Sequence, residues 1–496
     1  MWPFTSKQPV QESRTPPVLT RPQQRSFTAV DNLARYADFR VSTASADTEL
    51  QPALAKLRGK SRALDRNSSA MVRFLQLIET NVVGMAGFQF QCRVTKQDGV
   101  LDESLNQRVE MAWWRWCQRP TCDGKMTMVD FLCQMATTFK RDGEYLFEIV
   151  SDPRFPDGIG LNPIEADILD ENLNVNFMPN GNQIRMGVEI DSYGSPVAYH
   201  MLELHPGDGM WNMNTVKKRW RRVTADKIVH VFQRRRPGQT RGQPPSTIVN
   251  PIKMLDGYRE AEVTGRRMNA AQGGYIETEA GSVATIDALA DGGREDEADA
   301  DSDMLMNIEP GVVRSLKAGQ SFKPFNPNGN VSDYAQFEAQ IKKDIAAGMG
   351  ISVMSHGMET SGVSYSGGRT VTIEDRDFYK GVQRFLIDNG MEPIFTAWLK
   401  SHSLSDQSSF PPSRMMAVMD NHTFRGRGWD WVDPAKDIKA NAEGLRTRQM
   451  SLSQVAAQRG IDIRDLVAEI AADEAMLKSY GLTLTTDQSK AKPNAP

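Results

Sequence analysis

The chain has 496 residues, of which 40% are hydrophobic and 24% charged, and its formal net charge is −3. That length exceeds what one hydrophobic core holds, so we expect about two to four structural units. The small net charge excludes a chain that binds a polyanion through its overall electrostatic field. No window approaches the roughly 18 consecutive apolar residues that span a bilayer, so we expect no membrane segment.

Cysteine usage points to a reducing compartment. The sequence contains four cysteines, Cys92, Cys117, Cys122 and Cys133. Their spacing fits no zinc motif, and four cysteines in so long a chain do not make a disulfide framework. We therefore expect reduced and mostly buried thiols.

The N-terminal region is predicted to be an arm followed by helices. Residues 1–29 are rich in Pro, Gln and Ser and contain no continuous apolar stretch, which predicts a disordered or extended arm rather than a signal peptide. Apolar residues at helical spacing then predict three helices, over 30–78, 101–118 and 126–142. The second helix carries Trp113, Trp114 and Trp116. Tryptophans can stack on nucleic-acid bases, but packing in the core and between subunits is the favoured interpretation.

The middle of the chain changes character twice. From 144 to 232, short alternating runs separated by turn residues predict a β-rich segment. A helix is predicted over 250–273, where Asn250 and Pro251 supply an N-cap and a first-turn residue. The segment 287–303 then holds eight carboxylates and one arginine. Like charges at this density predict a solvated insertion, and their spacing lacks the pattern of a calcium-binding loop.

A second helix and a small-residue loop follow the insertion. Strand character returns over 304–325, and Ser332 is predicted to cap a helix that ends before Gly348. Residues 355–370 are rich in Gly, Ser and Thr and contain neither Lys nor Asp. This composition predicts a loop between two helices.

The C-terminal region is predicted to be helical. A long helix is expected over 367–399, with a kink or break at Pro393. The tail from 434 to 480 is also expected to form helices, with N-caps at Ser451 and Asp462.

The sequence offers no convincing catalytic centre. Nucleotide hydrolysis needs a glycine-rich loop ending in Gly-Lys-Ser/Thr, but the Gly-Lys-Ser at 59–61 lacks the first glycine and lies in a predicted helix. The six histidines are scattered, and none stands at the spacing of metal ligands. Asp167, Asp170 and Glu171 are an alternative metal site for a nuclease, although a turn-like surface segment is favoured. We expect no cofactor, no metal and no enzymatic activity.

Two basic clusters are candidates for contacts with phosphate or with another subunit. Their residues are Lys217, Lys218 and Arg219 in the first cluster and Arg234, Arg235 and Arg236 in the second. A solvated turn or an ion pair between subunits is the favoured interpretation. Six to ten phosphate contacts from such residues would give strong binding to DNA, whose affinity falls by about three to five decades between low and moderate salt.

Several segments in a fixed order carry a resemblance to a known family. They are ADILDEN, GVEIDSYGSPVAYHM, VTADKIVHVFQRRRPGQTRGQPPS, IEPGVVRSLKAGQSFKPFNP, SYSGGRT and RGWDWVDPAKDIKA. Together they resemble the portal proteins of tailed phages, specifically the lambda-like family, over roughly residues 30–480. One departure is that the family often has Tyr-Ser-Ser-x-Arg where this chain has Tyr-Ser-Gly-Gly-Arg at 365–369.

The resemblance implies a structural role in a virion. Portal proteins form a ring, usually of twelve subunits, at one capsid vertex, and double-stranded DNA enters and leaves through its channel. The implied partners are other copies of the chain, DNA, the terminase large subunit, a head–tail adaptor, the major capsid protein and scaffold, with no membrane. The implied location is the capsid vertex, and the host cytoplasm during assembly.

The resemblance also implies an α+β portal fold, with an α/β wing, two antiparallel stem helices, a strand-bearing clip and a helical C-terminal crown. The expected boundaries are an arm at 1–29, wing at 30–245, first stem helix at 246–273, clip at 274–332, second stem helix at 333–349, tunnel loop at 350–366, the rest of the wing at 367–433, crown at 434–482 and a disordered tail at 483–496.

The small-residue loop corresponds to the place of the tunnel loop in portals. Its expected DNA-facing tip consists of His356, Met358, Glu359, Thr360 and Ser361. An alternative is that the loop only caps a helix and packs within one subunit. Two other functions remain open at this stage, a metal-dependent nuclease of DNA packaging and a different ring-forming tail or connector protein.

Overall fold

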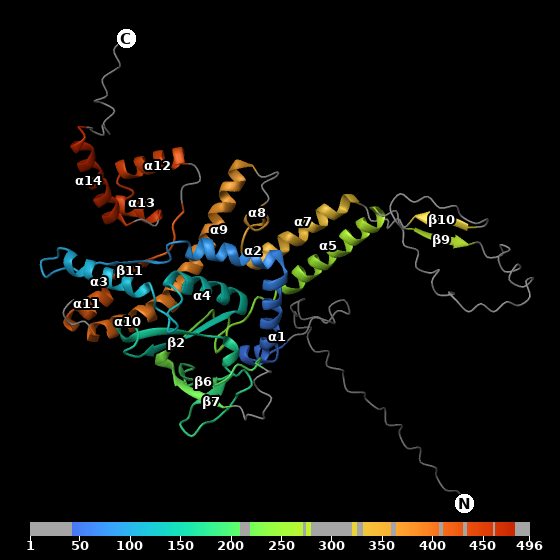
Figure 1. Ribbon diagram of the computed structural model, residues 1–496, viewed down its shortest axis with the longest axis horizontal. Coiled ribbons are helices and arrows are strands. Elements are labelled where there is room, and N and C mark those ends of the chain that lie inside the picture. Colours follow the sequence, from blue (N-terminus) through green and yellow to red (C-terminus); the bar gives the residue numbers. More distant parts are fainter. Residues whose placement is uncertain are drawn as a thin grey trace, which may run out of the picture. The chain divides into compact units, whose positions relative to one another are not determined.

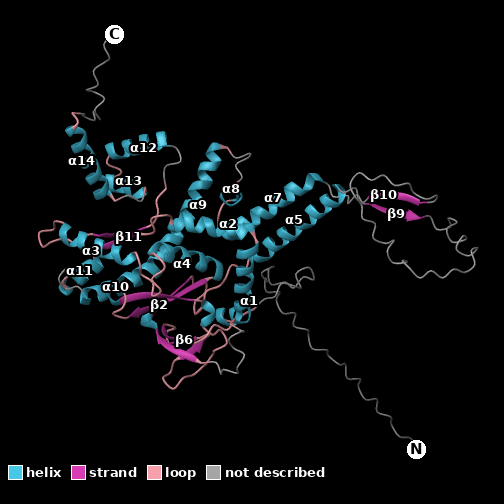
Figure 2. Ribbon diagram, in the orientation of Figure 1, coloured by secondary structure: helices cyan, strands magenta, loops and turns pink. Residues whose placement is uncertain are grey.

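The computed structural model describes residues 42–208, 219–270, 274–278, 320–324, 331–358, 364–405, 410–429, 434–459 and 462–481. Two compact units divide the chain, Met1–Ser45 and Ala46–Pro496, and every helix and strand named below belongs to the second. Figures 1 and 2 show the mixed α+β composition that the sequence predicts. The predicted arm, acidic insertion and C-terminal tail lie outside the described residues.

The first part of this unit is helical, as predicted. Its elements are α1 (Ala46–Asn67), α2 (Ser69–Ile78), the π-helical η3 (Glu79–Val83), α3 (Glu103–Cys117) and α4 (Met128–Asp142). Helix α4 begins with a capping box between Thr127 and Asp130, and it ends at Gly143, whose φ is 84°. A Cβ at Gly143 would lie 2.3 Å from the backbone carbon of Gln243, so only glycine fits where this helix end meets the later loop. The predicted helix at 59–61 is confirmed, which removes the Gly-Lys-Ser segment as a phosphate loop.

Two antiparallel sheets make up the predicted β-rich segment. One has the strand order β3-β2-β8 and the other β4-β5-β6-β7. The strands are β2 (Glu144–Ser151), β3 (Ile159–Ile164), β4 (Gln183–Arg185), β5 (Val188–Ile190), β6 (Pro196–Leu202), β7 (Trp220–Thr224) and β8 (Ile228–Phe232). Three 3-10 turns lie between them, η4 (Pro156–Gly158), η5 (Ala166–Ile168) and η6 (Ala225–Lys227).

The main core gathers aromatic side chains from segments far apart in the sequence. Strand β1 (Gln89–Cys92) pairs with β11 (His422–Arg425), which brings an early and a late segment of the chain together. Trp113 and Trp116 are buried there, and the Trp113 ring lies 5.0 Å from that of Trp398. Packing is therefore confirmed for these two tryptophans, whereas Trp114 is 66% exposed.

Helices α5 (Val249–Ala270) and α7 (Val331–Met349) lie side by side in Figure 1. They run antiparallel, because Arg259 bonds to Glu338 across the pair while Gly348, near the end of α7, meets Ile248 at the start of α5. The Tyr258 ring stacks on Tyr334 at 5.5 Å. The paired strands β9 (Gly274–Thr278) and β10 (Gln320–Pro324) occur between the two helices in the sequence. The predicted cap, Ser332, lies just inside α7, a difference of the size usual at helix ends.

The predicted loop at 355–370 is shorter than expected. Helix α8 (Val353–Gly357) occupies its start, and α9 (Tyr365–Leu386) begins two residues before the predicted start at Gly367. Ser364 caps α9 by accepting a hydrogen bond from the Gly367 amide, which offsets the low helix propensity of the two glycines. The π-helical η8 (Ile387–Met391) then precedes α10 (Glu392–Ser405). This π-helical turn ends two residues before Pro393, so the irregularity in the helix lies close to the predicted kink.

The C-terminal region contains the remaining elements. They are η9 (Pro412–Arg414), α11 (Met415–Asp420), α12 (Pro434–Arg446), α13 (Leu452–Gln458) and α14 (Ile463–Ser479). The predicted N-caps are confirmed, since Ser451 forms a capping box with Gln454 and the Asp462 side chain accepts from the Arg464 amide. Among the described residues, no helix combines the length and apolarity that crossing a membrane requires.

Candidate functional site

Between α7 and α9, Ser352 and Ser355 donate hydrogen bonds to the buried carboxylate of Asp375, and we call this group of three residues the clasp. Asp375, on α9, is buried and accepts hydrogen bonds from the Ser352 amide at 2.7 Å and the Ser352 hydroxyl at 2.6 Å. The Ser355 hydroxyl donates to the same carboxylate at 2.5 Å. Hydrogen bonds to a buried carboxylate are among the stronger ones in proteins, so α8 is held firmly against α9.

His356 does not lie at an exposed tip, in contrast to the prediction. Its side chain is buried, and its Nε2 lies 3.0 Å from the carbonyl oxygen of Ala70. Burial lowers the pKa of this imidazole, which is consistent with a neutral ring that donates to the carbonyl. The Arg73 guanidinium donates to the Ser355 carbonyl from the same side. His356 therefore anchors the segment to α2.

Met358, two residues after His356, is exposed. Its side chain is 71% exposed and its φ is 52°, a left-handed conformation that ends α8. Glu359, Thr360 and Ser361, the other predicted tip residues, lie outside the described residues. The structure thus separates an anchored His356 from an exposed Met358 two residues later.

The first basic cluster continues into strand β7. Lys217 and Lys218 lie outside the described residues, and Arg219 is exposed, with its guanidinium 4.0 Å from Glu203. The arginines that follow are bound within the subunit: Arg221 forms a bidentate pair with Glu148, and Arg222 pairs with Glu189. Of the three arginines, Arg219 thus lies farthest from its carboxylate partner.

All three arginines of the second basic cluster, Arg234, Arg235 and Arg236, are exposed. Arg234 lies over the ring of Phe232, and Arg236 pairs with Glu49 at 2.8 Å. A few residues later the chain turns inward at Arg241, which is fully buried. The exposed positions of Arg234, Arg235 and Arg236 fit surface contacts.

Of the acidic residues considered for a nuclease, Asp167 is paired with arginines, and Asp170 accepts a hydrogen bond from the indole of Trp220. Asp167 pairs with Arg58 at 2.9 Å and with Arg62 at 2.7 Å, and these two cations hold its pKa low against the opposing effect of burial. Arg62 also binds Glu165, whose carboxylate lies near His205. Within the described part of the chain, Glu165, Asp167 and His205 are the one set of three potential ligands close enough to share an ion. Because cations occupy this set, it does not fit a metal site.

A buried ion network, unnoticed in the sequence, fixes the helices against the sheets. Glu144 on β2 is fully buried and accepts from Arg241, Arg58 and His230. Burial alone would raise its pKa, but Arg241 above all keeps the pKa of Glu144 well below its usual range. Arg241 also donates to three backbone carbonyls, those of Ala166, Leu169 and Met186.

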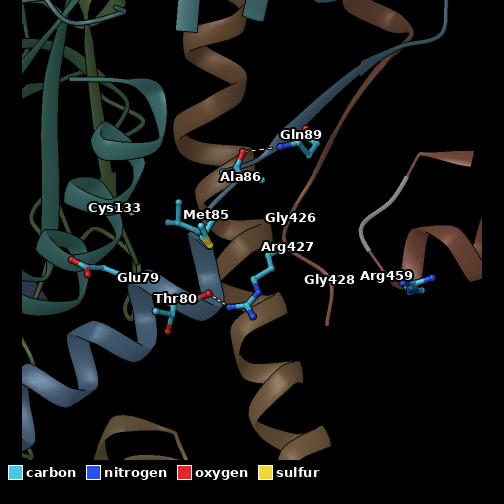
Figure 3. Close-up of a pocket in the computed structure, with 13 residues that line it drawn as sticks. Glu79, Thr80, Met85, Ala86, Gln89, Cys133, Gly426, Arg427, Gly428 and Arg459 are labelled. Carbon is cyan, nitrogen blue, oxygen red and sulfur yellow. Dashed lines mark hydrogen bonds between the residues drawn. The ribbon is translucent and has the colours of Figure 1, made fainter. Parts of the chain in front are cut away.

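A cavity of about 660 Å³ opens beside η3 (Figure 3). Most of its wall is apolar, and fully exposed Met85 lies at its edge. Arg427 crosses it to donate to the carbonyl of Thr80. Burial raises the pKa of the Cys133 thiol in its wall to about 11, so this thiol is not a nucleophile at neutral pH.

Comparisons with known proteins agree with the resemblance seen in the sequence. A family model described as "Phage portal protein, lambda family" matches residues 33–383. The probable portal protein of Halomonas phage phiHAP-1 is 31% identical over 96% of this chain and 90% of its own length. Portal protein B of Escherichia phage lambda is 20% identical over 88% of this chain and 87% of its own length.

A solved structure is also similar. A chain from the neck of an empty gene transfer agent particle is 15% identical and matches with a TM-score of 0.43, covering 82% of this chain and 93% of that one. The family model alone spans well over half of the sequence, and the phiHAP-1 relative extends the match to nearly all of it. Proteins of this family are structural components of the virion that form the portal vertex for DNA passage, and they are not enzymes. This chain belongs to the lambda family of phage portal proteins.

Proposed function

We propose that copies of this chain close into a ring, of about twelve subunits, around a channel for double-stranded DNA. The observation that carries the proposal is the antiparallel pair α5 and α7, which leaves Met254, Val263 and Phe337 exposed in a single copy. A neighbouring copy on each side would cover such side chains, since ring interfaces repeat one contact around an axis. In this arrangement α5 and α7 are the stem.

The remaining parts follow the order of the chain. The wing consists of 30–245 and 367–433, the stem of 246–273 and 333–349, the clip of 274–332 and the crown of 434–482. The antiparallel pair of strands β9 and β10, which occurs between these two helices in the sequence, supports a strand-bearing clip. The clip would present the docking surface for the terminase large subunit and later for a head–tail adaptor, while the wing would face the major capsid protein and scaffold.

The tunnel loop is proposed to begin at Met358, with Glu359, Thr360 and Ser361 as its tip. The clasp around Asp375 and the buried His356 support this, because they hold the segment just before the loop to α9 and α2, while Ser364 caps α9 just after it. Small residues with little charge would touch the phosphates of DNA without holding them. One lysine from each subunit at this position would add many phosphate contacts around the channel, and such contacts bind DNA strongly.

The Glu359→Lys substitution tests this assignment. Each subunit would place one added cation at the channel wall, so packaging of DNA into capsids should slow while the ring still assembles. DNase protection of packaged DNA measures the first effect, and native mass spectrometry measures the second. Glu374→Lys is the matched control, because Glu374 is an exposed residue on α9 next to the clasp. Equal packaging by both variants and the parent protein would contradict the assignment of the tip.

A further inference from the structure

Residues 434–481 form three helices that lack a core of their own. Among the side chains of this segment that the structure describes, Ala456 is the single buried hydrophobic one. Helices α12, α13 and α14 have 13, 7 and 17 residues. Helices of this length owe most of their stability to the packing of an apolar face. In one copy of the chain, that packing is largely missing.

Helix α14 has an apolar face that the described residues leave partly exposed. Leu466, Val467, Ile470 and Leu477 fall at helical spacing on one side of the helix. Leu466 and Leu477 are half-buried, whereas Val467 is 54% and Ile470 49% exposed. Exposed apolar faces of this kind mark contact surfaces in soluble proteins.

The two preceding helices expose apolar side chains as well. Ile438 on α12 is 53% exposed and Leu452 on α13 is 61% exposed. Leu445 lies two turns after Ile438 on the same side of α12 and is half-buried. The segment thus exposes apolar side chains on α14 and also on α12 and α13, although α13 and α14 touch each other within the chain.

The charges beside these two surfaces have opposite signs. Residues 434–459 contain five basic side chains, Lys436, Lys439, Arg446, Arg448 and Arg459, against two acidic ones. Helix α14 has the carboxylates Glu469, Asp473 and Glu474 in its middle, with no basic residue between Arg464 and Lys478. Two copies of α14 facing each other would bring like charges together, whereas α14 against α12 and α13 would bring opposite charges together.

We propose that the acidic apolar face of α14 in one copy packs on the basic apolar surface of α12 and α13 in the next copy. This contact rests on the proposed ring and specifies how its C-terminal segment is held together. A closed ring needs contacts between two different surfaces of each subunit, and this pair of surfaces supplies one. The contact covers Val467 and Ile470 on one side and Ile438 and Leu452 on the other.

Paired cysteines test the direction of the contact. The variant with both Ile438→Cys and Ile470→Cys is oxidised as the purified ring, and the products are separated without reductant. The expected result is a ladder of linked chains that extends to the full ring, since each chain links to a different neighbour on each side. Each single variant, and the parent with its four native cysteines, should give no ladder.

Other products would overturn the proposal. Links within one chain would mean that α14 covers its own α12, and dimers from Ile470→Cys alone would mean that two copies of α14 face each other. If the wild-type chain forms a ring but the paired variant gives no ladder, this contact is refuted while the proposed function is left intact. Failure of the wild-type chain to form any ring would refute both.

Hydrogen exchange supplies a second test that does not depend on cysteine geometry. Ile470→Glu should keep the ring but raise exchange of the α14 amides at least tenfold, because the added charge would be buried at the contact. Met476→Glu is the matched control, since Met476 is equally exposed on α14 but lies off the apolar face. Equal exchange in the two variants would contradict the proposal.

Discussion

The buried network around Glu144 gives the most specific prediction about stability. In Arg241→Leu, the guanidinium that is fully buried and donates to Glu144 is replaced by an apolar group. Glu144 would keep its contacts with Arg58 and His230, but it would lose the partner that lies 2.6 Å away. Three buried carbonyl oxygens would lose a donor at the same time.

The expected loss is large because one charge of a buried pair remains. Removing one partner of a buried ion pair typically costs about 3–5 kcal/mol. The control Arg236→Leu removes a guanidinium that is half exposed and paired with Glu49. Exposed pairs contribute about 0–1 kcal/mol, so the control should change stability little.

Urea unfolding followed by tryptophan fluorescence measures the difference, because Trp113 and Trp116 lie in the main core. We expect the free energy of unfolding of Arg241→Leu to fall by about 3–5 kcal/mol below the parent, well beyond the control. A loss within about 1 kcal/mol of the control would refute the reasoning, since it would show that the network does not depend on Arg241.

Two further predictions concern the core and pH. Trp116→Ala should lower the free energy of unfolding by about 3–5 kcal/mol, because the Trp116 side chain is buried. Trp114→Ala should change it by less than about 0.5 kcal/mol, because the Trp114 side chain is exposed. Equal losses for the two variants in urea unfolding would contradict this prediction. For pH, burial lowers the folded pKa of His356, so the unfolded chain binds more protons just below pH 6.5 and stability rises with pH there. His356→Gln should make that rise shallower, by at most about 1.4 kcal/mol per pH unit. His422 has the opposite sign: although burial opposes it, the hydrogen bond to Glu392 raises its folded pKa, so it stabilises below pH 6.5 and loses this effect as pH rises. This loss lowers stability above pH 6.5, so His422→Gln should make the fall in that range shallower. Unfolding free energies between pH 5 and 8 that show the same slope for both variants would contradict the assignment.

Much of the secondary structure could be predicted because its determinants are local. The capping box at Thr127 and Asp130, the N-caps Ser451 and Asp462, and the alternation from 144 to 232 are all visible in short stretches of sequence. The caps satisfy backbone groups within a few residues, so they depend little on the rest of the fold. The alternation is visible because successive side chains of a strand point to opposite faces of the sheet.

The site could be predicted only in part because its determinants are distant in sequence. His356 bonds to a carbonyl 286 residues away, and nothing near His356 in the sequence indicates that it is buried. The loop prediction at 355–370 overlooked α8 for the same reason, since Asp375 holds that short helix from the following element. Arg241 resembled the exposed arginines at 234–236 until the structure showed Glu144 beside it, 97 residues earlier.

Single-particle imaging of the purified chain tests the central claim most directly. The account predicts closed rings of one size, with radial symmetry and a central hole wide enough for a DNA duplex. Particles that remain single subunits under all assembly conditions, or rings whose centre is closed to a duplex, would contradict it.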